Sequence, residues 1–133
     1  MPSIFTKIIN REIPANIIAE NDNFLAFLDI SPLMLGHTLV IPKVEIDYIY
    51  DLQDEVLTDL HLFAKKVAKG IEKTVKCERI GITVMGLEVP HAHVHLLPMN
   101  SMSDMNFSKT KLAPTQEEMK ELASKIKQNI DLK

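Results

Sequence analysis

The chain has 133 residues, of which 46% are hydrophobic and 25% charged, and its formal net charge is −3. This length and composition predict one globular domain over residues 1–133, built around a single core. Because the chain lacks both an apolar run of about 18 residues and a basic block, we expect no membrane helix and no nucleic-acid partner. Cys77 is the single cysteine, so no internal disulfide can form, which favours the reducing cytoplasm.

Hydrophobic periodicity and turn residues predict a mixture of short strands and amphipathic helices. Ser3 is the expected N-cap of the first helix, and Asp51 is that of the longest helix, whose apolar residues recur every three or four positions. Thr115 and Glu118 form a capping box before the last helix, and Gly36 is expected to adopt unusual backbone angles. These patterns indicate an α+β fold. The expected elements are helix 3–10, strands 16–20, 24–29 and 37–41, helix 51–75, strands 79–85 and 89–97, and helix 115–129.

Residues 91–97 read His-Ala-His-Val-His-Leu-Leu and contain three of the five histidines. Because alternation is the period of a strand, His91, His93 and His95 are expected on one strand face and the apolar residues on the other. Imidazole can act as a nucleophile, an acid or base, a phosphate donor or a metal ligand. Three interpretations of this histidine row follow: an exposed histidine-rich strand, a metal site, or a site at which a histidine attacks phosphorus without a metal. Spacing alone does not separate the last two.

Four blocks of this sequence, in order, resemble the histidine triad (HIT) family, whose signature is His-φ-His-φ-His-φ-φ with φ apolar. The blocks are residues 4–14, 26–32, 36–43 and 86–98. The resemblance covers about residues 3–99 and leaves a C-terminal extension with the last helix. It implies a five-stranded antiparallel sheet with one long crossing helix and terminal helices. It also implies a homodimer whose two sheets join into one of ten strands.

The resemblance gives each histidine an expected role. In members of the family, the histidine that matches His93 attacks the α-phosphate of the substrate. The nucleotidyl-histidine that forms is then hydrolysed by water. His95 matches the histidine that contacts the phosphate and assists protonation of the leaving atom. His91 matches the orienting histidine, whose carbonyl fixes the tautomer of the nucleophile, and His37 matches a supporting residue. No metal and no cofactor are implied for this chemistry.

The same resemblance predicts a nucleoside-binding end of the site. Asp29 matches a residue whose carboxylate accepts hydrogen bonds from the ribose hydroxyls, although by itself it is equally a turn cap for Ser31. By hydrophobic pattern alone, the residues that match the base slot are ordinary core residues. They are Ile4, Phe5, Ile8, Phe27, Ile30 and Leu39.

The sequence departs from the family pattern in one place, just before the triad. Relatives usually carry Gln and then Ser or Thr before the triad, whereas this chain has Leu87, which cannot donate to a phosphate, and Glu88, whose carboxylate would lie beside it. Some relatives also carry a Cys-x-x-Cys zinc pair near the N-terminus. Ser3 and Thr6 stand there in this chain, so we expect no structural zinc.

Together these features predict a cytoplasmic, homodimeric nucleotide hydrolase or transferase. Its expected partner is a purine nucleotide, and it would cleave a nucleoside 5′-monophosphate, AMP in the first instance, from phosphoramidates or dinucleoside polyphosphates. One alternative is a metal-dependent hydrolase that uses the histidine row as ligands, with Glu88 as a further ligand or base. The other is a nucleotide-binding regulatory module with little turnover, which the replaced Gln would favour.

Overall fold

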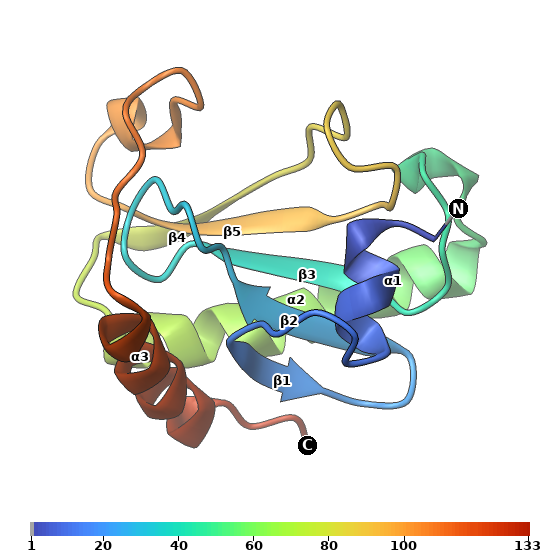
Figure 1. Ribbon diagram of the computed structural model, residues 1–133, viewed down its shortest axis with the longest axis horizontal. Helices are drawn as coiled ribbons and strands as arrows, with labels where there is room; N and C mark the ends of the chain where they lie inside the picture. Colours follow the sequence, from blue (N-terminus) through green and yellow to red (C-terminus); the bar gives the residue numbers. More distant parts are fainter. Residues whose placement is uncertain (1) are drawn as a thin grey trace.

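The computed structural model describes residues 2–133 as a curved five-stranded sheet with helices on both faces (Figure 1). The strand order is β1-β2-β3-β5-β4, and every neighbouring pair is antiparallel. The expected five-stranded antiparallel α+β fold is therefore confirmed. No helix within residues 2–133 is both long and apolar enough to cross a membrane. The elements are α1 (Ile4–Ile9), β1 (Ile17–Glu20), β2 (Phe24–Leu28), β3 (Thr38–Pro42), η1 (Ile49–Asp51), α2 (Asp54–Thr74), β4 (Arg79–Thr83), β5 (Val94–Met99), η2 (Met102–Met105) and α3 (Gln116–Asn129).

Both faces of the sheet are buried, which explains why β2 is apolar throughout and does not alternate. Leu25 and Phe27 point to one face, where they pack with Phe5 of α1. The intervening residues of β2 point to the other face, into the larger core that α2 and α3 cover. In Figure 1, α1 accordingly lies in front of the sheet and α2 behind it. The site described below lies on the α1 face.

The prediction that Asp51 is the N-cap of the long helix is wrong. Asp51 closes the short 3-10 turn η1, in which its N–H donates to the Tyr48 carbonyl at 2.9 Å. Leu52 then takes an extended conformation, so α2 begins only at Asp54, with Gln53 as its N-cap. The apolar stripe of α2 is buried as expected. By contrast, Ser3 and Thr115 cap α1 and α3 as expected.

The strand that carries the histidine row also differs from the expected range 89–97. β5 begins at Val94, so His91 and His93 precede the strand and only His95 lies on it. The His91 N–H closes a turn onto the Val89 carbonyl, and the Ala92 N–H donates to the Ile46 carbonyl outside the sheet. The alternation nevertheless persists, because Ala92, Val94 and Leu96 all enter the core beneath α2 while the histidines face the other way.

Two glycines are required by their surroundings. Gly36 has φ +99°, a conformation that L side chains rarely adopt, and it precedes β3 as the sequence predicts. A Cβ atom on Gly70 of α2 would overlap Ile130, so this glycine permits the close approach of the chain that follows α3.

Candidate active site

A cavity of about 340 Å³ lies on the α1 side of the sheet. His93 and His95 form part of its wall, together with Asp29 from the end of β2 and Glu88 from the loop between β4 and β5. The fold therefore brings together predicted site residues from two separated segments, the end of β2 and residues 88–95. The apolar part of the wall includes Ile4, Phe5 and Leu39.

The tautomer of His93 follows from its hydrogen bond. Its Nδ1 lies 2.7 Å from the His91 carbonyl oxygen, and because a carbonyl only accepts, Nδ1 carries the proton. In the neutral ring, Nε2 is therefore the unprotonated nitrogen and holds a free lone pair. Phe5 packs against this ring in a T-shaped arrangement, with 5.0 Å between the ring centroids, and the His93 side chain is only 5% exposed. His93 thus has the geometry of a nucleophile fixed in one tautomer.

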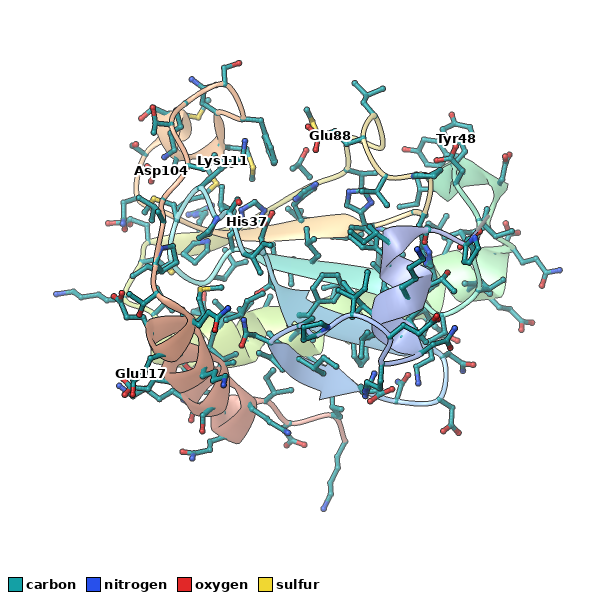
Figure 2. The ribbon with its side chains drawn as sticks, in the orientation of Figure 1. His37, Tyr48, Glu88, Asp104, Lys111 and Glu117 are labelled. Carbon is teal, nitrogen blue, oxygen red and sulfur yellow. The ribbon has the colours of Figure 1, made fainter. Side chains whose placement is uncertain are left out.

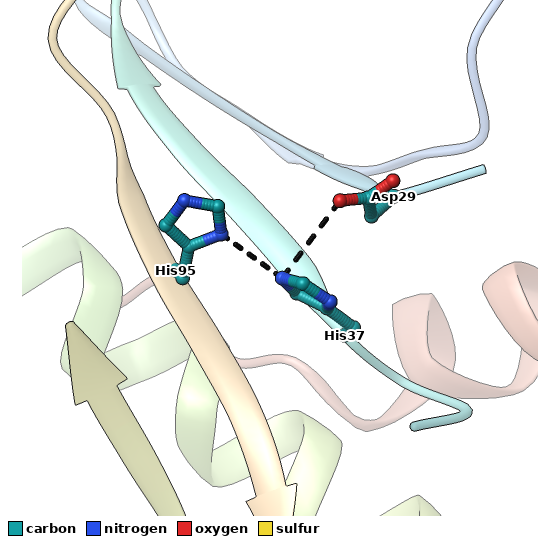
Figure 3. Close-up of side chains that lie close together, drawn as sticks. All are labelled: Asp29, His37 and His95. Carbon is teal, nitrogen blue, oxygen red and sulfur yellow. Dashed lines mark hydrogen bonds and ion pairs between the residues drawn. The ribbon is translucent and has the colours of Figure 1, made fainter. Parts of the chain in front are cut away.

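The tautomers of His37 and His95 are set by a chain of hydrogen bonds, drawn in part in Figure 3. The Leu33 N–H donates to His37 Nδ1 at 3.2 Å, so the His37 proton is on Nε2. That N–H donates to His95 Nδ1 at 2.9 Å. His95 Nδ1 therefore accepts, and its own proton is on Nε2. His95 thus has an N–H donor at Nε2, and both His95 and His93 line the cavity.

Burial keeps this pair neutral. Loss of solvation, and secondarily the proximity of His93 and His37, lowers the pKa of His95 to about 3. Burial likewise lowers the pKa of His37, an effect that Asp29 opposes and Lys111 reinforces. At neutral pH, His95 is thus a hydrogen-bond donor without a positive charge.

Asp29 serves both structural and cavity-facing roles. Its Oδ1 accepts the Ser31 N–H at 2.9 Å, which is the turn-capping bond expected from the sequence. Its Oδ2 lies 3.8 Å from His37 Nε2, and the side chain also lines the cavity (Figure 3). One oxygen is thus bound to the backbone, while the other lies close to the histidine pair.

Metal binding fits these hydrogen bonds poorly. Asp29, His37 and His95 do bring ligand atoms within 4.8 Å of one another. A metal on His37 Nε2 would displace its proton, yet the Leu33 N–H still faces the lone pair of Nδ1, so the ring would have to become an anion. A metal site on the histidine row of residues 91, 93 and 95 is also disfavoured. Both ring nitrogens of His91 are already hydrogen-bonded, one to Ser3 and the other to the Pro42 carbonyl.

Comparison with known proteins assigns this fold to a family. The family model described as "HIT domain" matches residues 10–102. The chain belongs to the HIT family. It is 36% identical over 135 residues to an uncharacterized HIT-like protein of Borreliella burgdorferi, covering 96% of this chain and 97% of that protein.

Two further relatives extend the comparison to a named activity and to a solved structure. The HIT chain is 41% identical over 96 residues to adenosine 5′-monophosphoramidase HNT1 of Saccharomyces cerevisiae, covering 71% of this chain and 61% of the yeast protein. It also superposes with a TM-score of 0.83 on a crystal structure of a Hit-like protein from Bartonella henselae. That pair is 30% identical, and the match covers 96% of each chain.

The expected base slot of this HIT chain divides into three groups. Ile4, Phe5 and Leu39 line the cavity. Ile8 and Phe27 do not line the cavity and are buried in the cluster that contains Phe5. Ile30 is 73% exposed and is absent from the cavity wall, because it follows the end of β2 in a turn that faces solvent.

Sequence reasoning missed several residues of the wall. Met85, Gly86 and Val89 flank Glu88, whereas Phe107 and Lys111 come from a distant segment. The Phe107 ring forms T-shaped pairs with two histidines. Its centroid lies 4.9 Å from that of the His95 ring and 6.0 Å from that of the His37 ring. The segment that carries Phe107 and Lys111 is tied to the loop after β2, since the Leu112 N–H donates to the Pro32 carbonyl at 2.8 Å. This segment lies beyond the HIT-like blocks and has no periodicity, so no signal in the sequence indicated it.

Lys111 changes the charge of the HIT cavity. Figure 2 shows it on the segment after η2, across the site from Glu88 on the loop between β4 and β5. Among the residues described, Lys111 is the one basic side chain other than histidine in this wall. The cavity thus has the Lys111 ammonium on one side and the Glu88 carboxylate on the other.

Proposed function

We propose that this chain is a nucleotide hydrolase that transfers a nucleoside 5′-monophosphate, AMP in the first instance, to His93 and then to water. The observation that carries the proposal is the hydrogen bond from His93 Nδ1–H to the His91 carbonyl, because it leaves Nε2 as a free nucleophile. The yeast relative's name, adenosine 5′-monophosphoramidase, supports a phosphoramidate as the substrate class.

In the first step, the Nε2 lone pair of His93 attacks the α-phosphorus. A phosphorus–nitrogen bond to the protein forms, and the bond to the leaving amine or phosphate breaks with its electron pair. The ring becomes cationic, and its Nδ1–H bond to the His91 carbonyl stabilises that charge. Water then displaces His93 from phosphorus and restores the neutral ring.

We propose that His95 donates a hydrogen bond from Nε2 to the phosphoryl group. If His95 lost its Nε2 proton, its buried ring would become an anion. Transfer of the His37 Nε2 proton to His95 Nδ1 would only move the negative charge to His37. The structure therefore favours phosphate contact over proton donation, and we expect the leaving group to take its proton from water. Lys111 adds a charged N–H donor to a wall in which Leu87 offers no donor.

The test is a rapid-quench experiment with adenosine 5′-phosphoramidate labelled at phosphorus. We expect an acid-labile, base-stable label on a peptide that contains His93, formed equally with and without EDTA. His93→Ala should abolish turnover and keep nucleotide binding, whereas His95→Ala should slow the reaction and leave measurable activity. Absence of label together with activity that EDTA removes and zinc restores would contradict the proposal.

A nucleotide-binding module with little turnover remains the second candidate. Leu87 is 87% exposed and apolar where relatives carry Gln, so the site lacks one phosphate donor. Tight AMP binding without any label or turnover in the same experiment would select this function.

We also propose a homodimer in a reducing cytoplasm. β4 is the last strand of the sheet, and its outer edge has no partner within residues 2–133. Ile82 on this strand is 52% exposed, and Met85 just beyond it is 48% exposed, which suits pairing with a second copy into ten strands. Ile82→Lys should convert the dimer into a monomer, as measured by light scattering during gel filtration. The proposed cytoplasmic location depends on the single free thiol of Cys77.

A further inference from the structure

Four polar side chains that do not line the cavity meet around the ring of His91. Ser3 and Thr6 come from the start of α1, Glu45 from the segment after β3, and His91 from the loop before β5. Ser3 is 5% exposed and His91 is fully buried. The cluster joins the N-terminus of the chain to the residue whose carbonyl holds the nucleophile.

The hydrogens of this cluster can be assigned because several partners only accept. The Pro42 carbonyl lies 2.8 Å from His91 Nε2, so Nε2 carries the ring proton and Nδ1 needs a donor. The Thr6 hydroxyl donates its hydrogen to the Glu45 carboxylate, which also accepts the Ser3 N–H at 2.6 Å. The Ser3 hydroxyl is thus the remaining donor. Its Oγ lies 2.8 Å from His91 Nδ1, closer than the 3.3 Å to its other acceptor, the Thr6 hydroxyl oxygen.

Burial reinforces this assignment. Loss of solvation lowers the pKa of His91, while the Pro42 carbonyl and Glu45 oppose the effect. The ring is therefore neutral at physiological pH and has one proton to place. Glu45 holds the Thr6 hydrogen, which stops that hydroxyl from competing with Ser3 for the same acceptor.

We propose that Ser3 is a positioning residue of the reaction. Its hydroxyl holds His91 in the Nε2–H tautomer and in one orientation, and the His91 carbonyl in turn keeps the His93 proton on Nδ1. This inference rests on the proposed role of His93 as the nucleophile. Ser3 touches neither substrate nor the reacting atoms, and it acts through two residues in series.

Ser3 is also the N-cap of α1, since its Oγ accepts the Thr6 N–H at 3.0 Å, so a cap role must be separated from a positioning role. Ser3→Asp separates them, because aspartate is a good N-cap acceptor but has no hydrogen for His91 when ionised. Ser3→Thr is the matched control, since threonine both accepts and donates. Circular dichroism melting of both variants checks that the fold is retained.

The readout is the ¹⁵N NMR spectrum of the imidazole rings, together with steady-state kinetics on adenosine 5′-phosphoramidate. In Ser3→Asp, we expect His91 Nδ1 to move to the position of a protonated nitrogen, and kcat to fall about tenfold, equivalent to ~1.4 kcal/mol of barrier, with KM unchanged. Ser3→Thr should match the wild type in both measurements. An unchanged His91 signal and an unchanged kcat in Ser3→Asp would overturn the proposal and leave Ser3 as a helix cap only.

Failure of this inference is distinguishable from failure of the proposed function. If the wild type does not cleave the phosphoramidate, the proposed function fails, whereas the ¹⁵N signals of His91 and His93 still report whether Ser3 sets their tautomers. If the wild type is active and Ser3→Asp behaves as Ser3→Thr does, only the positioning role fails.

Discussion

The buried histidines should make this protein unusually sensitive to mild acid. Burial lowers the pKa values of His37, His91 and His95, the last to about 3, whereas in the unfolded chain histidine titrates near 6.5. Between these values the unfolded state binds protons that the folded state does not, so the free energy of unfolding decreases as the pH falls below about 6.5. Stability contributed by the neutral rings is fully present above that pH.

The magnitude follows from His95. Each pH unit within its window reduces the free energy of unfolding by up to ~1.4 kcal/mol, so lowering the pH from 6.5 to 5 costs about 2 kcal/mol from this residue. His37 and His91 shift in the same direction and add to it. Carboxylates with lowered pKa values, such as Glu20, lose their contribution only at lower pH, below their usual value of 4.5.

The assay is urea unfolding followed by circular dichroism at a series of pH values from 8 to 5, at one protein concentration because a dimer would otherwise shift the midpoint. His61→Gln is the control, because His61 lies exposed on α2 and outside the site. The variant should keep the full pH dependence, while His95→Gln should flatten it. A free energy of unfolding that stays constant from pH 7 to pH 5 would refute the assignment of neutral buried rings.

Three further predictions concern the cavity. Asp29→Asn should weaken nucleotide binding by about 1–3 kcal/mol in calorimetry, because the carboxylate would lose its bonds to the ribose hydroxyls; a 2′,3′-dideoxynucleotide should bind wild type and variant alike. Lys111→Met should reduce the affinity for AMP but leave the affinity for adenosine unchanged. The same substitution at the exposed Lys120 of α3 is the control, and an equal loss for both ligands would contradict a phosphate contact of Lys111. Glu88→Ser should shift the ratio of kcat/KM values from substrates with a cationic leaving group toward dinucleoside polyphosphates, and an unmoved ratio would mean that Glu88 does not face the leaving group.

Local signals predicted the elements well where one short-range interaction decides them. Ser3 and Thr115 cap their helices as expected, since a side-chain acceptor three residues before an N–H is a local arrangement. The start of α2 was predicted too early, because Asp51 has the right chemistry for a cap, but a 3-10 turn intervenes. Whether that turn or the helix forms depends on how the segment packs, which the sequence does not express.

The histidine row shows the same division at the site. Alternation with apolar residues determined that His91, His93 and His95 would face away from the core, and this holds even where the chain leaves the sheet. The pattern did not determine that His91 would bond backward to Ser3 while His95 bonds sideways to His37, because these partners are 88 and 58 residues away in the chain. Those contacts, and with them the tautomers, exist only after the segments are brought together.

The sequence by itself determined the layered α+β fold, the faces of its strands and the histidines of the site, because hydrophobic period and a local motif carry that information. Only the tertiary structure decided which residues close the cavity and how the protons are placed. Phe107 and Lys111 line the cavity, and a backbone hydrogen bond from Leu112 to Pro32 holds their segment there. The positions of the ring protons depend on acceptors such as the Pro42 carbonyl. Any sequence position can supply a backbone carbonyl, so no residue pattern reveals which one will face a given ring.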